Sequence, residues 1–298
     1  MKENKYLNLY IKYLTYEKNY SIKTIDSYNR DILEFYQYTS EEGINFLKPS
    51  YDDARFYIMY LKDKKKNTSS SVSRKISSLR SFYRYLVEQE IIETDPFHLL
   101  TLPKKEQKLP KFFSYNELQQ LFVIPDLNQA LGQRDSLILE MLYATGVRVS
   151  ELVNIKLSDI SLSENSIKVL GKGNKERIVY FENVCKKRLN LYLNDGYKVL
   201  NKKNSKYLFL NNNGNQITTR GIEYILDKII KKTALEKNIS PHMIRHSFAT
   251  HLLNEGCELT SVQELLGHES LTATSIYTHI TNDSLKEVYY KTHPRAKK

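Results

Sequence analysis

The first part of the chain repeats apolar residues at three- and four-residue intervals, the pattern of amphipathic helices. These stripes occupy four stretches: Lys5–Glu17, Tyr20–Gly43, Tyr51–Leu61 and Ser71–Ile92. In the longest, apolar side chains form one face and basic side chains the opposite face: Arg74, Lys75, Arg80 and Arg84. The pattern predicts a four-helix, all-α domain over residues 1–95.

The helical pattern then breaks. Residues 95–113 contain three prolines and four lysines. Proline lacks an amide donor and disfavours helix at the residue before it, so we predict a linker at 96–113. Ser114 and Glu117 form a capping-box pattern that opens a new helix. The second domain is therefore predicted to span 114–298.

The second domain shows both the two-residue alternation of strands and the three- to four-residue spacing of helices. Two strands, Ser166–Leu170 and Arg177–Phe181, flank a glycine-containing turn, and Asn211–Gly214 marks another turn. Helical patterns fill the rest: 115–124, 130–145, 149–156, 182–199, 219–232, 241–255, 260–267 and 270–280. We expect a mainly α protein with a small antiparallel β-sheet, in which an α-helical N-terminal domain precedes a mixed α/β (α+β) domain.

Charge points to a polyanionic partner. The formal net charge is +11, and residues 1–108 carry 19 Lys and Arg against 15 Asp and Glu, a net of +4, which leaves +7 for the rest. Because both halves share the excess, the partner is expected to touch both. A basic protein without such a partner is the alternative. The basic row Arg74, Lys75, Arg80 and Arg84 is the candidate surface for nucleic acid.

Other bulk features narrow the class. No run of 18 or more apolar residues exists, and the first residues lack the apolar core of a secretion signal. Cys185 and Cys257 lack metal-type spacing and are expected to be reduced and buried. These features favour a cytoplasmic protein without a membrane segment.

Arg148 is the first candidate for chemistry. It stands between Gly146, which ends one predicted helix, and Ser150-Glu151, which begins the next. Backbone amides point outward at a helix start, and arginine can bind a phosphate with two parallel hydrogen bonds. A surface arginine paired with Glu151 is the alternative.

His242 and Arg245 lie three residues apart on a predicted helix that begins at Pro241, so they share one face. A cation and an imidazole on one face suit an anionic oxygen. His242 and His246 also have the spacing of a metal site, but Met243 stands where a zinc protease has glutamate, so no metal is expected. His246 and His251 are expected to be structural.

Two further segments hold candidate residues that indicate a function only in combination with the other candidates. His268 follows Gly267 at a helix break, and Tyr277 lies nine residues later on the next predicted helix. Lys172 sits at the tip of the glycine hairpin, whose sequence does not match a phosphate-binding P-loop. Each residue alone is better explained as part of the core or the surface.

Together, these segments resemble the tyrosine recombinase (phage integrase) family, whose signature is Arg…Lys…His-x-x-Arg…His…Tyr. The matching residues are Arg148, Lys172, His242, Arg245, His268 and Tyr277. The phrases ATGVRVSEL, GKGNKER, PHMIRHSFATHLL and LGHESLTATSIYTHI look most like the bacterial Xer branch. The resemblance spans nearly the whole chain, and residues 1–95 look like the family's core-binding (SAM-like) domain.

The resemblance implies an enzyme that cuts and rejoins double-stranded DNA through a 3′-phosphotyrosyl bond to Tyr277, without ATP, metal or another cofactor. It implies a homotetramer, or a heterotetramer with a second recombinase, on paired sites, and a septal DNA translocase as a further partner. Resolution of chromosome or plasmid dimers is the expected role. A mobile-element integrase, a type IB topoisomerase and a non-cleaving architectural DNA-binding protein are the alternatives.

The C-terminal residues 281–298 carry Leu285, Val288 and Tyr289 at helical spacing. They could fold back on their own domain. The family implies docking into a neighbouring subunit instead, which would influence the nearby Tyr277.

Overall fold

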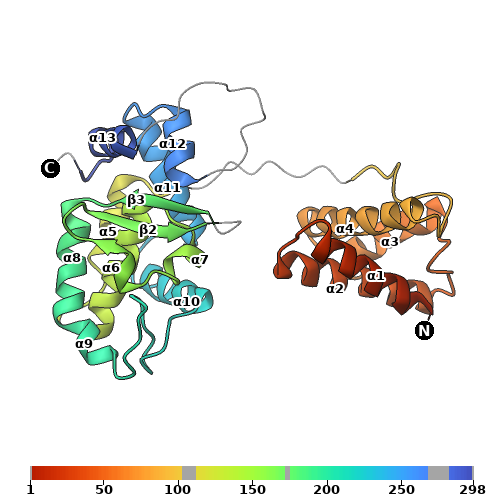
Figure 1. Ribbon diagram of the computed structural model, residues 1–298, viewed down its shortest axis with the longest axis horizontal. Coiled ribbons are helices and arrows are strands. Elements are labelled where there is room, and N and C mark those ends of the chain that lie inside the picture. The colour runs from red at the N-terminus through yellow and green to blue at the C-terminus, as the bar shows by residue number, and fades with distance from the viewer. Residues whose placement is uncertain (1, 103–111, 172–174, 268–281, 297–298) are drawn as a thin grey trace. The chain divides into compact units, whose positions relative to one another are not determined.

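The computed structural model describes residues 2–102, 112–171, 175–267 and 282–296. The chain divides into two compact units, Met1–Leu109 and Pro110–Lys298, called here the N-terminal and C-terminal units (Figure 1). No helix within the described ranges combines the length and apolar content that a membrane crossing requires.

The helices of the N-terminal unit are α1 (Lys2–Tyr16), α2 (Ile22–Glu41), α3 (Tyr51–Asp63) and α4 (Ser69–Glu88). Three of them begin at hydroxyl N-caps, Ser21, Ser50 and Thr68, whose side chains accept a hydrogen bond from the amide three residues on. The four helical stripes of the sequence are therefore confirmed as helices. Aromatic rings dominate their shared core, with Tyr10, Tyr57, Tyr83, Phe35 and Phe82 fully buried.

The segments that flank residues 103–111 pack into the units on either side. Phe97 and Leu100 are buried in the N-terminal core, and Arg80 holds this segment by donating hydrogen bonds to both of their carbonyl oxygens. Phe113 is buried in the C-terminal core, and its amide donates to the Ser247 hydroxyl at 2.8 Å.

The C-terminal unit is built around α6 (Ala130–Thr145), which is buried along most of its length. It packs against α8 (Asn183–Asn194), α9 (Gly196–Leu200) and α11 (Pro241–Asn254). The remaining helices are α5 (Tyr115–Phe122), α7 (Val149–Leu152), η1 (Leu157–Asp159), α10 (Thr219–Ile230), α12 (Leu259–Leu266) and α13 (Asn282–Thr292). The expected helix 270–280 lies outside the described residues.

A small antiparallel sheet covers one side of this helical core (Figure 1). Its order is β1-β2-β3, from Ile160–Ser161, Ser166–Leu170 and Glu176–Tyr180. The predicted hairpin is confirmed as β2 and β3, with Val169 opposite Arg177 and the Gly171 amide bonded to the Lys175 carbonyl at 2.8 Å. The two-residue β1 was not predicted, because it is too short to show alternation.

One predicted helix, 182–199, is divided in the structure. Asp195 leaves the helical conformation, at φ −126° and ψ −80°, between α8 and α9. The cause is a contact with α6: Gln133 donates to the Asp195 carboxylate at 2.6 Å and accepts from the Gly196 amide at 2.8 Å. The break therefore depends on a residue more than sixty positions away in sequence, which helical periodicity does not reveal.

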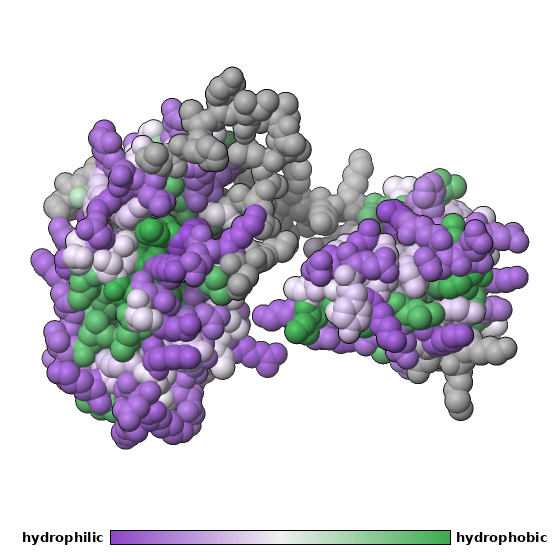
Figure 2. Space-filling view, viewed as in Figure 1, coloured by the Kyte–Doolittle hydropathy of each residue, from purple (hydrophilic) through white to green (hydrophobic). Residues whose placement is uncertain are grey.

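Hydrophilic side chains project over most of the visible surface of both units, and apolar residues reach it in smaller patches (Figure 2). Both cysteines, Cys185 and Cys257, are buried and free, as expected.

Candidate active site

Arg148 occupies the point where α6 ends and α7 begins. Gly146 closes α6 in the left-handed conformation (φ 59°), and a Cβ there would lie 2.5 Å from the Phe248 ring, so glycine is required for both reasons. Arg148 is then the N-cap of α7 in extended backbone, with one third of its side chain exposed. Its guanidinium is therefore fixed at a helix start but open to solvent.

Arg245 projects from the first turns of α11 and is almost fully buried. The helix starts with Pro241 after the N-cap Ser240, as the sequence predicts, and Ile244 and Phe248 bury its apolar face. Arg245 donates to the Gly146 carbonyl oxygen at 2.5 Å and to the Leu266 carbonyl oxygen at 2.8 Å. One guanidinium thus joins the ends of α6 and α12 to α11.

Burial and the neighbouring charge of Arg148 lower the pKa of Arg245 to about 10. The guanidinium therefore still carries its charge at neutral pH. Its neutral carbonyl partners hold it in place without cancelling that charge, which remains available to an anion.

Glu151 is the acidic residue at the centre of the cluster, and its side chain is 3% exposed. It accepts hydrogen bonds from the Arg148 amide at 2.8 Å and from Arg148 Nη1 at 2.9 Å. Arg177 adds a two-pronged bond, with both nitrogens 2.8 Å from the carboxylate oxygens. Burial opposes ionisation of Glu151, but these donors prevail and lower its pKa.

The cluster is therefore a cationic site. Arg148 and Arg177 pair with the Glu151 carboxylate, and Arg245 lies close enough to interact with it electrostatically. The three guanidinium groups and the one carboxylate leave a net charge of +2. The Arg148–Glu151 pair that was the alternative explanation of Arg148 does form, yet Arg177 engages the same carboxylate. An anionic group such as a phosphodiester would offset part of this positive excess.

His242 lies on α11, one turn before Arg245, and is exposed. His251 is buried and its Nδ1 lies 2.9 Å from the Tyr143 hydroxyl, so its expected structural role is confirmed. His246 is half-buried beside the Phe112 ring. Within the described ranges, no group of three or more His, Cys, Asp or Glu residues is arranged to hold a metal ion.

Lys172, His268 and Tyr277 lie outside the described residues, but the residues next to two of them are at the cluster. A Cβ on Gly171, which precedes Lys172, would lie 3.5 Å from Arg177 Nη1 and 3.7 Å from Glu151 Oε1. Gly267, which precedes His268, accepts a hydrogen bond from Arg148 Nη2 at 3.2 Å. The chain therefore enters both segments beside the arginines.

The candidate DNA-contact row on α4 divides into two kinds of cation. Arg74 pairs with the buried Asp31, Lys75 pairs with Glu34, and Arg80 donates to backbone carbonyls. Arg84 is exposed. The first three thus have partners inside their own unit, and Arg84 is the member of the row most open to a phosphate.

Sequence reasoning did not single out Arg177, and considered Glu151 only as a possible surface partner. The sequence nevertheless contained a local feature that indicated each of these two residues. Glu151 is the third residue of α7, the capping-box position. Arg177 stands two residues before the buried Val179 on β3, so the two side chains share the inward face, where an arginine requires a carboxylate.

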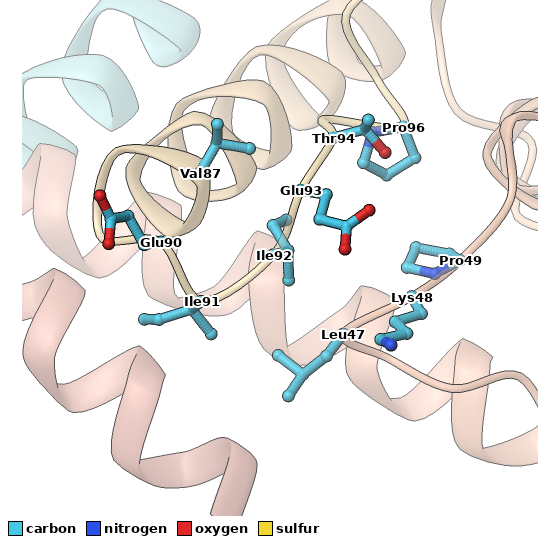
Figure 3. A pocket seen from close by; sticks show the side chains of 10 residues that line it. All are labelled: Leu47, Lys48, Pro49, Val87, Glu90, Ile91, Ile92, Glu93, Thr94 and Pro96. Carbon is cyan, nitrogen blue, oxygen red and sulfur yellow. The ribbon is translucent and has the colours of Figure 1, made fainter.

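A cavity of about 590 Å³ lies in the N-terminal unit. It opens between the segment before α3, at Leu47 to Pro49, and the segment after α4, at Glu90 to Pro96 (Figure 3). Its described lining mixes Lys48 with Glu90 and Glu93 among aliphatic residues and contains no histidine or tyrosine.

Two family models match the chain. The phage integrase family matches residues 111–283, and the phage integrase N-terminal SAM-like domain matches residues 7–90.

Similar proteins cover almost the whole length. The chain is 50% identical to tyrosine recombinase XerC of Anoxybacillus flavithermus over 294 residues, 97% of this chain and 98% of that protein. It is 43% identical to tyrosine recombinase XerC of Bacillus subtilis over 98% of this chain and 97% of that one.

Among solved structures, XerH site-specific recombinase bound to palindromic difH substrate, in a post-cleavage complex, is 26% identical. Its TM-score is 0.70, over 91% of this chain and 80% of that chain. XerA recombinase is 30% identical with a TM-score of 0.50, over 98% and 99%.

Proposed function

The chain belongs to the phage integrase family, and we propose that Tyr277 is its nucleophile and that Arg148 and Arg245 bind the phosphate it attacks. The protein is a Xer-type site-specific tyrosine recombinase, which binds DNA and breaks and rejoins it through a covalent phosphotyrosine intermediate. The residue roles given below are the proposal.

The arrangement of Arg148 and Arg245 is the observation that supports these roles best. Attack on a phosphodiester increases negative charge on its non-bridging oxygens, and fixed donors stabilise that charge without reorganising during the reaction. Arg245 is held by two carbonyl oxygens and Arg148 by Glu151. Both guanidiniums are therefore oriented before DNA binds, in a cluster with an excess of positive charge.

Proton transfer falls to the other matched residues. A tyrosine phenol has an unperturbed pKa of about 10, so attack by Tyr277 at neutral pH is helped by a base, and His242 is the candidate. As the Tyr277 oxygen bonds to phosphorus, the bond from phosphorus to the 5′-oxygen breaks, and that oxygen takes a proton, for which Lys172 is the candidate acid. His268 donates a hydrogen bond to the phosphoryl group. A 5′-hydroxyl of the partner duplex then reverses the step.

The assembly that follows is a tetramer on two paired sites, either of one chain or with a second recombinase. Near-complete coverage of XerC relatives favours resolution of chromosome or plasmid dimers in the cytoplasm, with a septal DNA translocase as regulator. Integration of a mobile element uses the same chemistry and is the second candidate. A non-cleaving architectural protein is not favoured, because binding alone requires no Tyr277.

The test uses a nicked suicide duplex that carries the site selected by the wild-type chain from random-sequence DNA. Loss of the small 5′-hydroxyl fragment traps the covalent complex, which is then counted on a denaturing gel. Tyr277→Phe should bind this duplex like wild type and form no covalent complex. Tyr224→Phe, which alters an exposed tyrosine (60% exposed) on α10, is the matched control and should cleave normally. A covalent band with Tyr277→Phe would place the nucleophile elsewhere.

A further inference from the structure

Arg177 lies where three parts of the active site meet, although it is not among the residues that match the family signature. It sits on β3 opposite Val169, close to the end of the hairpin that carries Lys172. Its side chain is 16% exposed. It therefore belongs to the interior of the cluster and not to the surface that would meet DNA first.

The Arg177 guanidinium grips Glu151 with its two terminal nitrogens, each at 2.8 Å. The same carboxylate accepts two bonds from Arg148. Since Glu151 is shared, the position of Arg148 is coupled to that of β3. The planar guanidinium of arginine can form such a two-pronged bond, whereas the single ammonium group of lysine cannot.

The stem of Arg177 fills the space beside Gly267. A Cβ on Gly267 would approach Arg177 Cδ to 2.9 Å and its Nε to 3.0 Å, and Gly267 itself has φ +64°. On the hairpin side, a Cβ on Gly171 would lie 3.5 Å from Arg177 Nη1. One side chain thus occupies the space beside the residue before Lys172 and beside the residue before His268.

We propose that Arg177 is a positioning residue. It sets the distance between the Gly171 end of the β2–β3 hairpin and the Arg148–Glu151 pair, so that the hairpin presents its general acid to the phosphate held by the arginines. The inference rests on the proposed roles of Lys172 and Arg148. It predicts that replacing Arg177 impairs protonation of the leaving group more than it impairs DNA binding.

The test compares two suicide duplexes that differ at one atom. In one, the bridging 5′-oxygen at the cleaved bond is replaced by sulfur. A thiol has a pKa of about 8.5, far below that of an alcohol, so the sulfur leaves without a general acid. A displacement of about 1 Å can cost roughly 10²-fold in rate. Arg177→Lys should therefore slow cleavage of the oxygen substrate about 10²-fold and that of the sulfur substrate far less.

Lys168→Met is the matched control. Lys168 forms an exposed pair with Glu176 on the same hairpin (side chains 54% and 56% exposed), so its loss disturbs the hairpin without touching Glu151. Its ratio of sulfur to oxygen cleavage rates should equal that of wild type. Lys172→Ala is the positive control and should raise the ratio.

The ratio of the two rates is independent of the folded fraction, so partial unfolding of a variant does not obscure the result. A wild-type ratio in Arg177→Lys, beside a raised ratio in Lys172→Ala, would overturn the positioning role. An unchanged ratio in Lys172→Ala would instead refute the proposed general acid. An Arg177→Lys ratio that rises toward that of Lys172→Ala would support the inference.

Discussion

Two clusters of buried charge lie in the C-terminal unit, and their imbalances have opposite signs. The active-site cluster has three cations and one anion: Arg148, Arg177, Arg245 and Glu151. The second has two anions and one cation: Glu140, Glu182 and Arg295. The first cluster lacks an anion, which DNA would supply. In the second cluster, the cation is Arg295, which lies in the C-terminal segment.

The second cluster explains how the C-terminal segment, residues 282–296, is held. Arg295 donates to Glu140 at 2.5 Å, and the two side chains are 10% and 1% exposed. Tyr289 and His293 are buried beside it, and the Tyr290 hydroxyl donates to the Phe181 carbonyl at 3.1 Å. In the single chain, the segment therefore folds back onto its own unit.

The pairing in this second cluster is incomplete. Glu140 Oε1, Glu182 Oε1 and His293 Nε2 are buried and have no hydrogen-bond partner among the described residues. Burial raises the pKa of Glu140 to about 7 despite Arg295, and burial lowers the pKa of His293 to about 3. The catalytic cluster also leaves one buried atom, Arg177 Nε, without a partner, so the two clusters differ in the sign of their charge imbalance and in the number of unpaired atoms. Docking of this segment into a neighbouring subunit stays a prediction.

The largest expected effect is on the catalytic cluster. Arg148→Ala and Arg245→Ala should each slow covalent-complex formation by roughly 10²–10³-fold, because each removes a donor to the transition state. DNA affinity should fall much less, as measured by mobility shift. Lysine at either position should not restore the rate, since the two-pronged geometry is lost. Equal losses of rate and affinity would reduce both to ordinary phosphate contacts. Arg55→Ala, at an exposed surface pair, is the control.

The next effect is on stability. Arg295→Ala removes one partner of a buried pair and should cost about 3 kcal/mol at pH 8, measured by urea unfolding. At pH 5 the loss should be smaller, because Glu140 is then protonated in the folded state. Lys286→Ala breaks an exposed pair with Glu164 and should cost less than about 1 kcal/mol at either pH. A pH-independent loss for Arg295→Ala would contradict this account of Glu140.

A third prediction separates two opposing titrations. The raised pKa of Glu140 makes stability fall as pH rises from about 4.5 to about 7, whereas the lowered pKa of His293 makes stability rise from about 3 to about 6.5. The two effects cancel between about 4.5 and 6.5, each with a slope of at most about 1.4 kcal/mol per pH unit.

Single substitutions should reveal how each group changes stability with pH. Stability is measured by urea unfolding between about pH 4.5 and pH 6.5. Relative to wild type, Glu140→Gln should make stability rise with pH, and His293→Phe should make it fall. If both variants keep the wild-type profile, neither group titrates with the second cluster.

The smallest expected effect is on the salt dependence of DNA binding. It compares two cations of α4, Arg84 and Lys75, of which Lys75 already pairs with Glu34. Binding to DNA should weaken steeply with salt, and each phosphate contact contributes about −0.9 to the log–log slope. Arg84→Ala should make the slope shallower by about one unit. Lys75→Met, which removes a cation already paired with Glu34, should lower stability and leave the slope unchanged. The reverse pattern would show that the internal pair opens to bind DNA.

Local patterns in the sequence were enough to predict most elements and to mark Arg148 and Arg245 as candidates, but not Arg177. Helical stripes, the caps at Ser50 and Ser114 and the glycine hairpin each depend on residues within a few positions of one another. Arg148 and Arg245 were candidates because each stands at a recognisable helix start, and the family signature selected them from the alternatives. Lys172, His268 and Tyr277 rest on the family signature and stay predictions.

Tertiary structure decided what the charged residues do. The Glu151–Arg177 bond, the carbonyl partners of Arg245 and the Arg295–Glu140 pair join residues 26, 99 and 155 positions apart. The same holds for the buried Asp31, which pairs with Arg74 from 43 positions away. A charged side chain has the same local signature whether it faces water or a buried partner. Its partner, and hence its role, is set by which distant segments the folded core brings within hydrogen-bond distance.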